Sequence, residues 1–292
     1  MIALAFLLQT IRIAIPYLFA AAGGVMSERV GIIALGLEGM MLSGAFGAAL
    51  GSYYGHSPYF GLLGALVAGL IMTSILAVST LRFKANQVVV GVALNLLAVG
   101  VTRFFLRLTF DSASNSPRVP GFGGESTNAG MFASFLNQLV WIGLLALPAL
   151  GWLLYKTPFG LRARAVGEKP EAAATLGIGV VPLRLKGLLI SGSLAALGGA
   201  YLALDQHQFT DGMTAGRGFI ALAAVIFGRW QPVRVAIACF LFAAAETLQI
   251  QLQGAQLVPS QFVEMIPYVL TIVALAGVVG RSVAPAALGK TE

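Results

Sequence analysis

Charged residues are scarce in this sequence. Only 10% of its 292 residues are Asp, Glu, Lys or Arg, whereas a soluble domain averages about 25%. Apolar residues make up 58% of the chain, and the mean hydropathy is +0.88. This composition excludes a soluble globular enzyme, a disordered chain and a nucleic-acid module with a membrane tail. It predicts an all-α, polytopic integral membrane protein.

Cysteine and histidine are also nearly absent. Cys239 is the only cysteine and stands in an apolar run, so neither an intrachain disulfide nor a Cys-rich metal site can form. His56 and His207 fall at predicted outer ends of helices and are not spaced as metal ligands, so no metal site is expected. The patterns Gly-x-Ser-x-Gly, His-Glu-x-x-His and the phosphate-binding P-loop are missing. We therefore expect a transport protein with no ATPase site of its own and no bound cofactor, and a membrane-embedded enzyme is disfavoured.

Long apolar runs account for most of the chain. A spanning helix needs about 20 apolar residues, and we count about nine such segments, within a range of about eight to ten. The runs cover residues 3–22, 30–52, 59–81, 86–106, 135–155, 187–205, 214–228, 235–252 and 263–280. No Lys or Arg precedes the first run, which we interpret as a span rather than a cleaved signal peptide. A single transmembrane domain is expected over residues 1–292.

Basic residues are distributed unevenly between the predicted loops. When the loops near Arg82 and Arg229 and the stretch 156–186 face the cytoplasm, 13 of the 18 basic residues lie inside. The positive-inside rule then places the N-terminus outside and the C-terminus inside. The longest outer loop, about 107–134, separates a first half of about 1–106 from a second half of about 135–281.

Glycine is abundant, with 36 residues, and two apolar runs are interrupted by it. Residues 30–52 and 212–228 run in opposite directions in this threading, and the second is too short to cross a bilayer unaided. Paired glycine-broken segments in inverted halves are typical of transporters with a solute path at mid-membrane. Ordinary packing of small residues between helices explains the same pattern. Both interpretations stay open at this point.

The inner loop 156–186 predicts a short helix on the cytoplasmic face. Pro170 suits a first helical turn, and Glu171 follows it at the positive helix start. Three alanines, Ala172, Ala173 and Ala174, favour the helix, and Gly177 favours a left-handed stop. Such a helix could insert into a groove of a partner protein or could be a solvated connector.

Ionisable and amide groups inside the runs are few. Glu38 stands in the glycine-broken part of the second run, where it could line a cavity or hold helices together. Asn95 could bind a polar solute or a neighbouring helix. Glu246 is interpreted as a member of a structural ion pair.

Four blocks of the sequence resemble one family. Residues 27–40, beginning Ser-Glu-Arg-Val-Gly, are similar to the signature of nucleoside-type permeases of bacterial ABC importers, within the larger branched-chain amino acid, ribose and nucleoside permease family. Residues 84–96, 164–178 and 211–230 are similar to three further blocks of that family, in the same order. One departure is Ala34, which stands where the family usually has Asn.

The resemblance implies a division of labour. An extracytoplasmic binding protein captures the solute, two permease subunits (two copies or a copy and a paralogue) form the path, and a cytoplasmic ATPase uses ATP. The segment around 168–177 would be the coupling helix that docks on the ATPase. The residues implied in coupling are Gly167, Glu168, Pro170, Glu171, Ala172, Ala173, Ala174 and Gly177.

The solute is then expected to be a nucleoside or a related small polar molecule that moves inward across the bacterial cytoplasmic membrane. An uncharged nucleoside needs hydrogen-bonding groups and apolar faces rather than rings of charge, and the candidate lining is Glu38, Gln87, Asn95 and Phe219. The alternative is an ion-coupled secondary transporter, which would need an acidic coupling site at Glu38 or Glu246.

Overall fold

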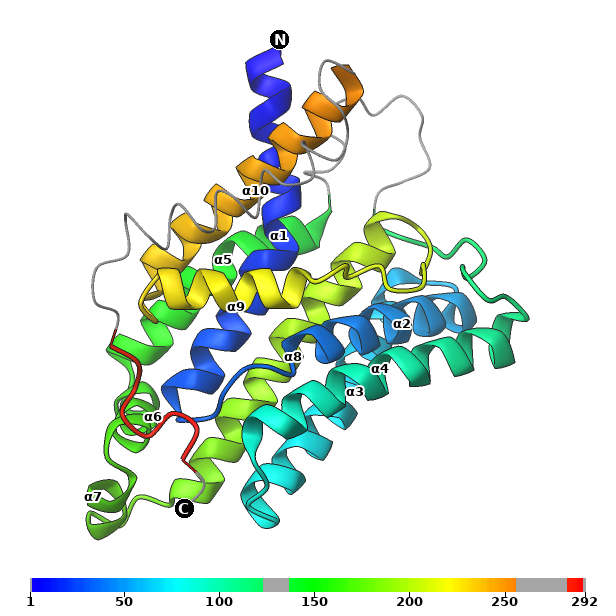
Figure 1. Cartoon of the computed structure of the whole chain (residues 1–292). Coiled ribbons are helices and arrows are strands. Elements are labelled where there is room, and N and C mark those ends of the chain that lie inside the picture. Colours follow the sequence, from blue (N-terminus) through cyan, green and yellow to red (C-terminus); the bar gives the residue numbers. More distant parts are fainter. Residues whose placement is uncertain (1, 123–136, 256–282, 291–292) are drawn as a thin grey trace.

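The computed structural model describes residues 2–122, 137–255 and 283–290 (Figure 1). Within these ranges every regular element is a helix. The helices are α1 Ile2–Arg29, α2 Leu37–Gly55, α3 Pro58–Ala77, the π-helix η1 Val78–Arg82, α4 Gln87–Phe110, α5 Gln138–Lys156, α6 Pro158–Glu168, α7 Pro170–Thr175, α8 Val180–Asp205, α9 Arg217–Phe227 and α10 Pro232–Ala255. The all-helical prediction is therefore confirmed.

Six of these helices are long and apolar enough to cross a membrane: α1, α3 with η1, α4, α5, α8 and α10. The chain is a multi-pass integral membrane protein. Two of the predicted runs form shorter helices than expected. The run 214–228 contains α9, which has only 11 residues, and in the run 30–52 the helix α2 begins only at Leu37, seven residues after the start of the run. The run 263–280 lies outside the described residues. The total of about nine segments and the inverted relation between the halves stay predictions.

Side-chain caps fix where several helices begin. Asn86 accepts hydrogen bonds from two amides of the first turn of α4, and Asn137 accepts one from the first turn of α5. The Thr157 hydroxyl does the same for α6. These caps bond N–H groups that have no partner within the helix. Short polar residues in the sequence therefore determine where these helices begin.

Helix α8 forms the centre of the bundle, and most of it is buried, whereas α4 is largely exposed. Helix α8 packs against α1, α2 and α3, and glycines allow the closest approaches between these helices. A Cβ added at Gly199 of α8 would lie 1.9 Å from the main-chain oxygen of Met41 in α2. Since a membrane offers helices little hydrophobic driving force, such close packing of small residues holds the bundle together.

The first part of the predicted outer loop pairs with the segment that precedes α9. The amides of Ser116 and Val119 donate to the carbonyls of Phe209 and His207, each at 2.8 Å. An ion pair of 2.7 Å joins Arg103 of α4 to Asp211. The two halves of the chain are therefore tied together at this end of the molecule.

We expect Gly199→Ala to lower the free energy of unfolding by about 2–3 kcal/mol, because the new methyl group meets a main-chain atom that cannot rotate away. Thermal unfolding of the purified protein in detergent would measure this. The matched control is Gly100→Ala on the exposed face of α4, where nothing lies within 4 Å of the added Cβ. That control should keep the melting temperature or raise it, and equal losses for both variants would contradict the packing argument.

Candidate functional site

The connection between α1 and α2, residues 30–36, is non-helical and mostly buried. Buried backbone groups outside a helix need other hydrogen-bond partners, and most strongly so in a membrane protein. The end of α1 supplies two of them. The Ser27 hydroxyl donates to the Ile32 carbonyl at 2.8 Å, and the Glu28 carboxylate accepts from the Ala34 amide at 3.3 Å.

Two side-chain amides of α4 bind the same connection. Gln87 Oε1 accepts from the Ile33 amide at 2.9 Å. Asn95 accepts from the Gly39 amide at 2.8 Å and donates to the Leu35 carbonyl at 2.9 Å. Both side chains are buried. They hold the non-helical backbone in one conformation, which is the neighbour-binding alternative that the sequence left open for Asn95.

Glu38, in the first turn of α2, binds the start of α9. Its carboxylate accepts from the Thr214 hydroxyl at 2.6 Å, from the Gly216 amide at 2.9 Å and from the Gly218 amide at 2.7 Å. A carboxylate at a helix N-terminus satisfies orphan amides and is stabilised by the helix dipole. Glu38 therefore joins the two glycine-interrupted segments that the sequence singled out. Phe219 follows directly in α9 and is about half exposed.

Two further polar groups were not predicted as site residues. Glu28 also accepts a hydrogen bond from the Trp230 indole, and the Trp230 carbonyl accepts from Arg29 at 2.9 Å. The end of α1 thus holds the turn between α9 and α10. The only signal in the sequence was the acidic residue of the Ser-Glu-Arg block, which was used for the family resemblance alone.

Glu246 forms an ion pair with Arg217 at 2.8 Å and also accepts from the Tyr17 hydroxyl. The prediction that it is a structural pair member is confirmed. The pair joins α10 to the first residue of α9, so the start of α9 is held from two sides: by Glu38 of α2 and by Glu246 of α10.

The predicted cytoplasmic helix is present as α7, and a longer helix, α6, precedes it. Pro170 occupies its first turn, and Gly177, at φ +78°, follows its end, as predicted. Among the implied coupling residues, Glu168, Glu171, Ala172, Ala174 and Gly177 are exposed, whereas Gly167, Pro170 and Ala173 are buried. The buried members cannot contact another protein directly.

Gly167 has a packing role at the end of α6. A Cβ at this position would lie 2.1 Å from the Arg29 carbonyl oxygen. The end of α6 therefore rests directly on the end of α1, immediately before the α1–α2 connection.

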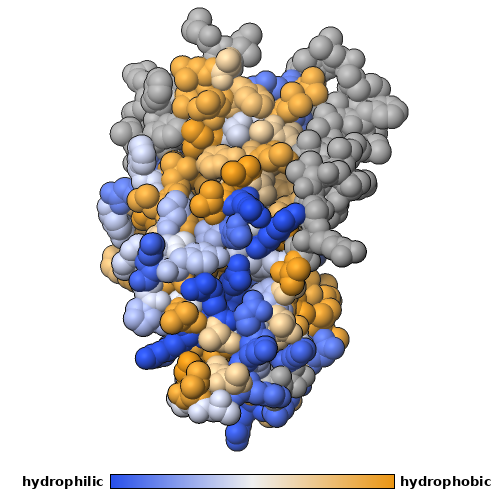
Figure 2. All heavy atoms as spheres, turned by 90° about the vertical axis from the view of Figure 1, so that its left-hand side faces the viewer, coloured by the Kyte–Doolittle hydropathy of each residue, from blue (hydrophilic) through white to orange (hydrophobic). Residues whose placement is uncertain are grey.

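The face of the molecule that includes α6 and α7 is mixed in polarity. Figure 2 shows mostly hydrophobic side chains over its upper part and hydrophilic side chains interspersed with hydrophobic ones over its middle and lower parts. Two leucines of this segment are exposed: Leu161 of α6 is 62% exposed, and Leu176, directly after α7, is 80% exposed.

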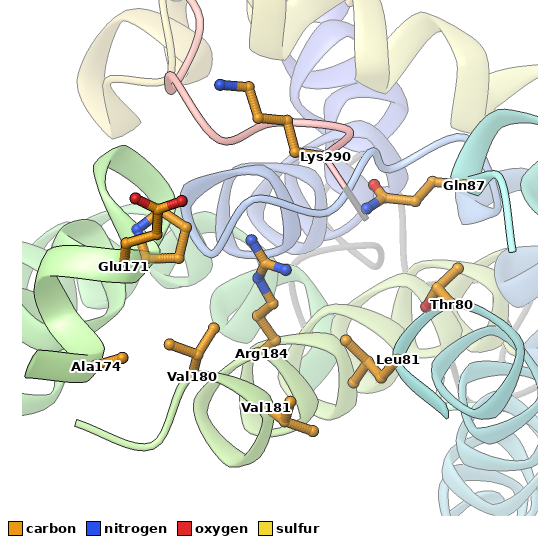
Figure 3. Close-up of a pocket in the computed structure, with 10 residues that line it drawn as sticks. Thr80, Leu81, Gln87, Glu171, Ala174, Val180, Val181, Arg184 and Lys290 are labelled. Atoms are coloured by element: carbon orange, nitrogen blue, oxygen red, sulfur yellow. The ribbon is translucent and has the colours of Figure 1, made fainter. Parts of the chain in front are cut away.

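A pocket of about 240 Å³ opens between α7, α8 and η1 (Figure 3). Arg184 extends from α8 into its middle, with Glu171 on one side and Gln87 on the other. Arg184 is buried, and its Nε donates to the Val30 carbonyl at 3.3 Å. The pocket thus lies between the coupling segment and the α1–α2 connection.

The structure brings three of the four predicted path residues, Glu38, Gln87 and Asn95, to the α1–α2 connection and the adjoining first turn of α2. The pocket at α7 is lined by three of the implied coupling residues, Pro170, Glu171 and Ala174, and by the path candidate Gln87. Their roles in transport and coupling stay predictions.

Comparison with known proteins gives consistent results. The chain is 39% identical to the guanosine ABC transporter permease protein NupQ of Bacillus subtilis, over 96% of this chain and 93% of that protein. It is 38% identical to the nucleoside ABC transporter permease protein NupC of Lactococcus lactis, over 94% of this chain and 92% of that protein.

A solved structure described as an inward-facing ABC transporter of the metal-chelate type has a similar fold. The TM-score is 0.53 at 17% identity, with 92% of this chain and 85% of that chain covered. Residues 6–275 match the family described as branched-chain amino acid transport system / permease component. With this match over most of its length, the chain belongs to that permease family.

Proposed function

We propose that the protein is the permease subunit of an ABC importer that moves nucleosides inward across a bacterial cytoplasmic membrane. The observation that carries the proposal is the similarity, at 39% and 38% identity over nearly the whole chain, to a guanosine and a nucleoside permease. The six apolar helices supply the membrane-spanning body that this function needs.

The proposal includes three partners. A cytoplasmic ATPase binds and hydrolyses ATP, a second permease subunit completes the path, and an extracytoplasmic binding protein delivers the solute. The charge distribution supports an orientation in which the coupling segment faces the cytoplasm. The basic loops and the segment 156–186 fall on the same side of the membrane in the predicted topology, and basic loops favour the inside. The C-terminus then lies inside.

The exposed face of α7 and its surroundings is the part that docks on the ATPase. Glu171, Ala172 and Ala174 are exposed, and Leu176 extends the face with an apolar side chain that is 80% exposed. The opposite side of the segment is anchored through buried Pro170 and Ala173. A push on the exposed face would therefore be transmitted through packed contacts rather than absorbed by a flexible loop.

The solute path is proposed to run beside the α1–α2 connection and the start of α9. Glu38, Gln87 and Asn95 hold the backbone there, and Phe219 presents an exposed aromatic ring from α9. A nucleoside combines an uncharged polar sugar with a planar base, and aromatic rings stack on such bases. A shift of α9 against α2 would open or close this path.

The alternative, ion-coupled transport, has weaker support. Both acidic candidates are engaged in structural interactions: Glu246 pairs with Arg217, and Glu38 accepts three hydrogen bonds at α9. A coupling carboxylate has to exchange its ion during the cycle, which these contacts oppose.

The function is tested with the chain reconstituted in liposomes together with the three proposed partners: the ATPase, the second permease subunit and the binding protein. We expect uptake of radiolabelled guanosine that requires ATP, persists with a protonophore while ATP is maintained, and is competed by unlabelled adenosine but not by ribose. Uptake that the protonophore abolishes at constant ATP would support the ion-coupled alternative instead, and competition by ribose alone would reassign the solute to a sugar.

The docking face is tested by Leu176→Ser. Loss of a central apolar contact at an interface costs more than about 1 kcal/mol, so we expect binding of the ATPase to weaken about ten-fold. Co-purification in a salt series would measure it. The matched control is Leu108→Ser, the same substitution at an exposed leucine near the end of α4, 67% exposed against 80%. Equal retention of the ATPase by both variants would contradict the docking assignment.

Glu38 is tested against Glu246. Glu38→Ala leaves two partly buried amides and a hydroxyl without their acceptor, and we expect a loss of about 2–3 kcal/mol in stability, with about half of that for Glu38→Gln. We also expect the initial uptake rate per folded protein to fall more in Glu38→Ala than in Glu246→Ala, since only Glu38 joins α2 to α9. Equal uptake losses would remove Glu38 from the transport path.

A further inference from the structure

A short segment near the C-terminus, residues 283–290, lies against the ends of α1 and α6. We refer to it as the C-terminal strap. It is drawn in red in Figure 1, where it runs beside α6 to the C-terminus. Pro285 and Ala287 are buried, although the strap has no regular secondary structure. A segment this short with buried residues is held by specific contacts rather than by its own fold.

One set of contacts joins the strap to the end of α6. The Ala287 amide donates to the Gly167 carbonyl at 3.0 Å. The Ala286 amide donates to the Glu168 carboxylate at 3.3 Å. Both acceptors are the last residues of α6, directly before α7. The strap therefore binds the coupling segment at the end of α6.

A second set joins the strap to the α1–α2 connection. The Gly289 amide donates to the Gly31 carbonyl at 3.2 Å. A Cβ at Gly31 would lie 3.3 Å from the Ala287 carbonyl oxygen, and one at Gly289 would lie 2.9 Å from Ile33 Cδ1. The backbones are thus in direct contact, with no side chain between them.

The strap therefore bridges two elements that have different roles in the proposed function. On one side is the segment that receives the push from the ATPase. On the other is the connection that leads into α2, where Glu38 binds the start of α9. Coupling between distant sites is carried by packed, hydrogen-bonded networks of this kind.

We propose that the C-terminal strap is a positioning element that couples the α6–α7 segment to the α1–α2 connection, so that both move together during transport. This inference rests on the proposed function and adds a defined route for the motion. Ala287 is its central residue, because its amide donates to the Gly167 carbonyl and its own carbonyl oxygen would lie 3.3 Å from a Cβ added at Gly31.

The first test is Ala287→Trp in the complete transporter reconstituted in liposomes. The side chain is 1% exposed, so the indole has to lift the strap from its two contacts. We expect guanosine uptake to fall at least about five-fold, while the ATPase still co-purifies and its ATP hydrolysis continues. The matched control is Ala284→Trp, which adds the same bulk at an exposed position of the strap. Uptake equal to that of the control would overturn the proposal.

A second test does not depend on the folding of a bulky variant. Glu168→Cys and Ala286→Cys place two thiols where the side chain and backbone are in contact, and a short bis-maleimide can join them. Cys239 is fully buried and stays unreactive. If the strap and α6 move as one unit, the cross-linked transporter keeps its uptake rate. Loss of uptake on cross-linking would show that the strap has to separate from α6, which contradicts the proposal.

Uptake by the wild-type transporter distinguishes a failure of the proposed function from a failure of the role proposed for the strap. Absence of ATP-dependent guanosine uptake in the wild type contradicts the proposed function itself. Normal uptake in the wild type, together with normal uptake in Ala287→Trp, contradicts the role of the strap alone.

Discussion

A backbone that leaves the helical path inside a membrane protein has to find a hydrogen-bond partner for each exposed N–H and C=O group. The α1–α2 connection meets this constraint with partners from four places: the end of α1, α4, α8 and the C-terminal strap. Because its partners come from four elements, the connection can keep its conformation only while these elements keep their positions relative to one another. The rest of the architecture follows from that dependence.

Because buried backbone groups need hydrogen-bond partners and the sequence has few polar residues, single carboxylates accept several hydrogen bonds each. Glu28 binds both the connection and the α9–α10 turn, and Glu38 binds three groups at the start of α9. Each carboxylate joins elements that are far apart in the sequence. A substitution at either position therefore acts on two structural elements at once, and loss of function there does not by itself indicate contact with the solute.

Much of the fold could be predicted from the sequence, because apolar runs and short polar breaks determine helices locally. The α7 helix was predicted in this way from Pro170 and Gly177. The non-local contacts could not be. Nothing in the local pattern indicates that Gln87 and Asn95 bind backbone of the α1–α2 connection, that Gly167 touches Arg29, or that residues 283–290 lie against α6. Such contacts depend on helix packing, which small residues permit but do not specify individually.

The arrangement also indicates how a push at one end could reach the middle of the molecule. A soft loop would absorb displacement, whereas the end of α6 rests on α1 through Gly167 with no side chain between the backbones. From there the connection leads within a few residues to Glu38. The Glu38 carboxylate accepts a hydrogen bond from the first turn of α9, and Glu246 of α10 forms an ion pair with Arg217 in the same turn. Since α9 has only 11 residues and both Glu38 and Glu246 bind its start, a displacement of either carboxylate would change the position of the helix, as the alternating access of the proposed function requires.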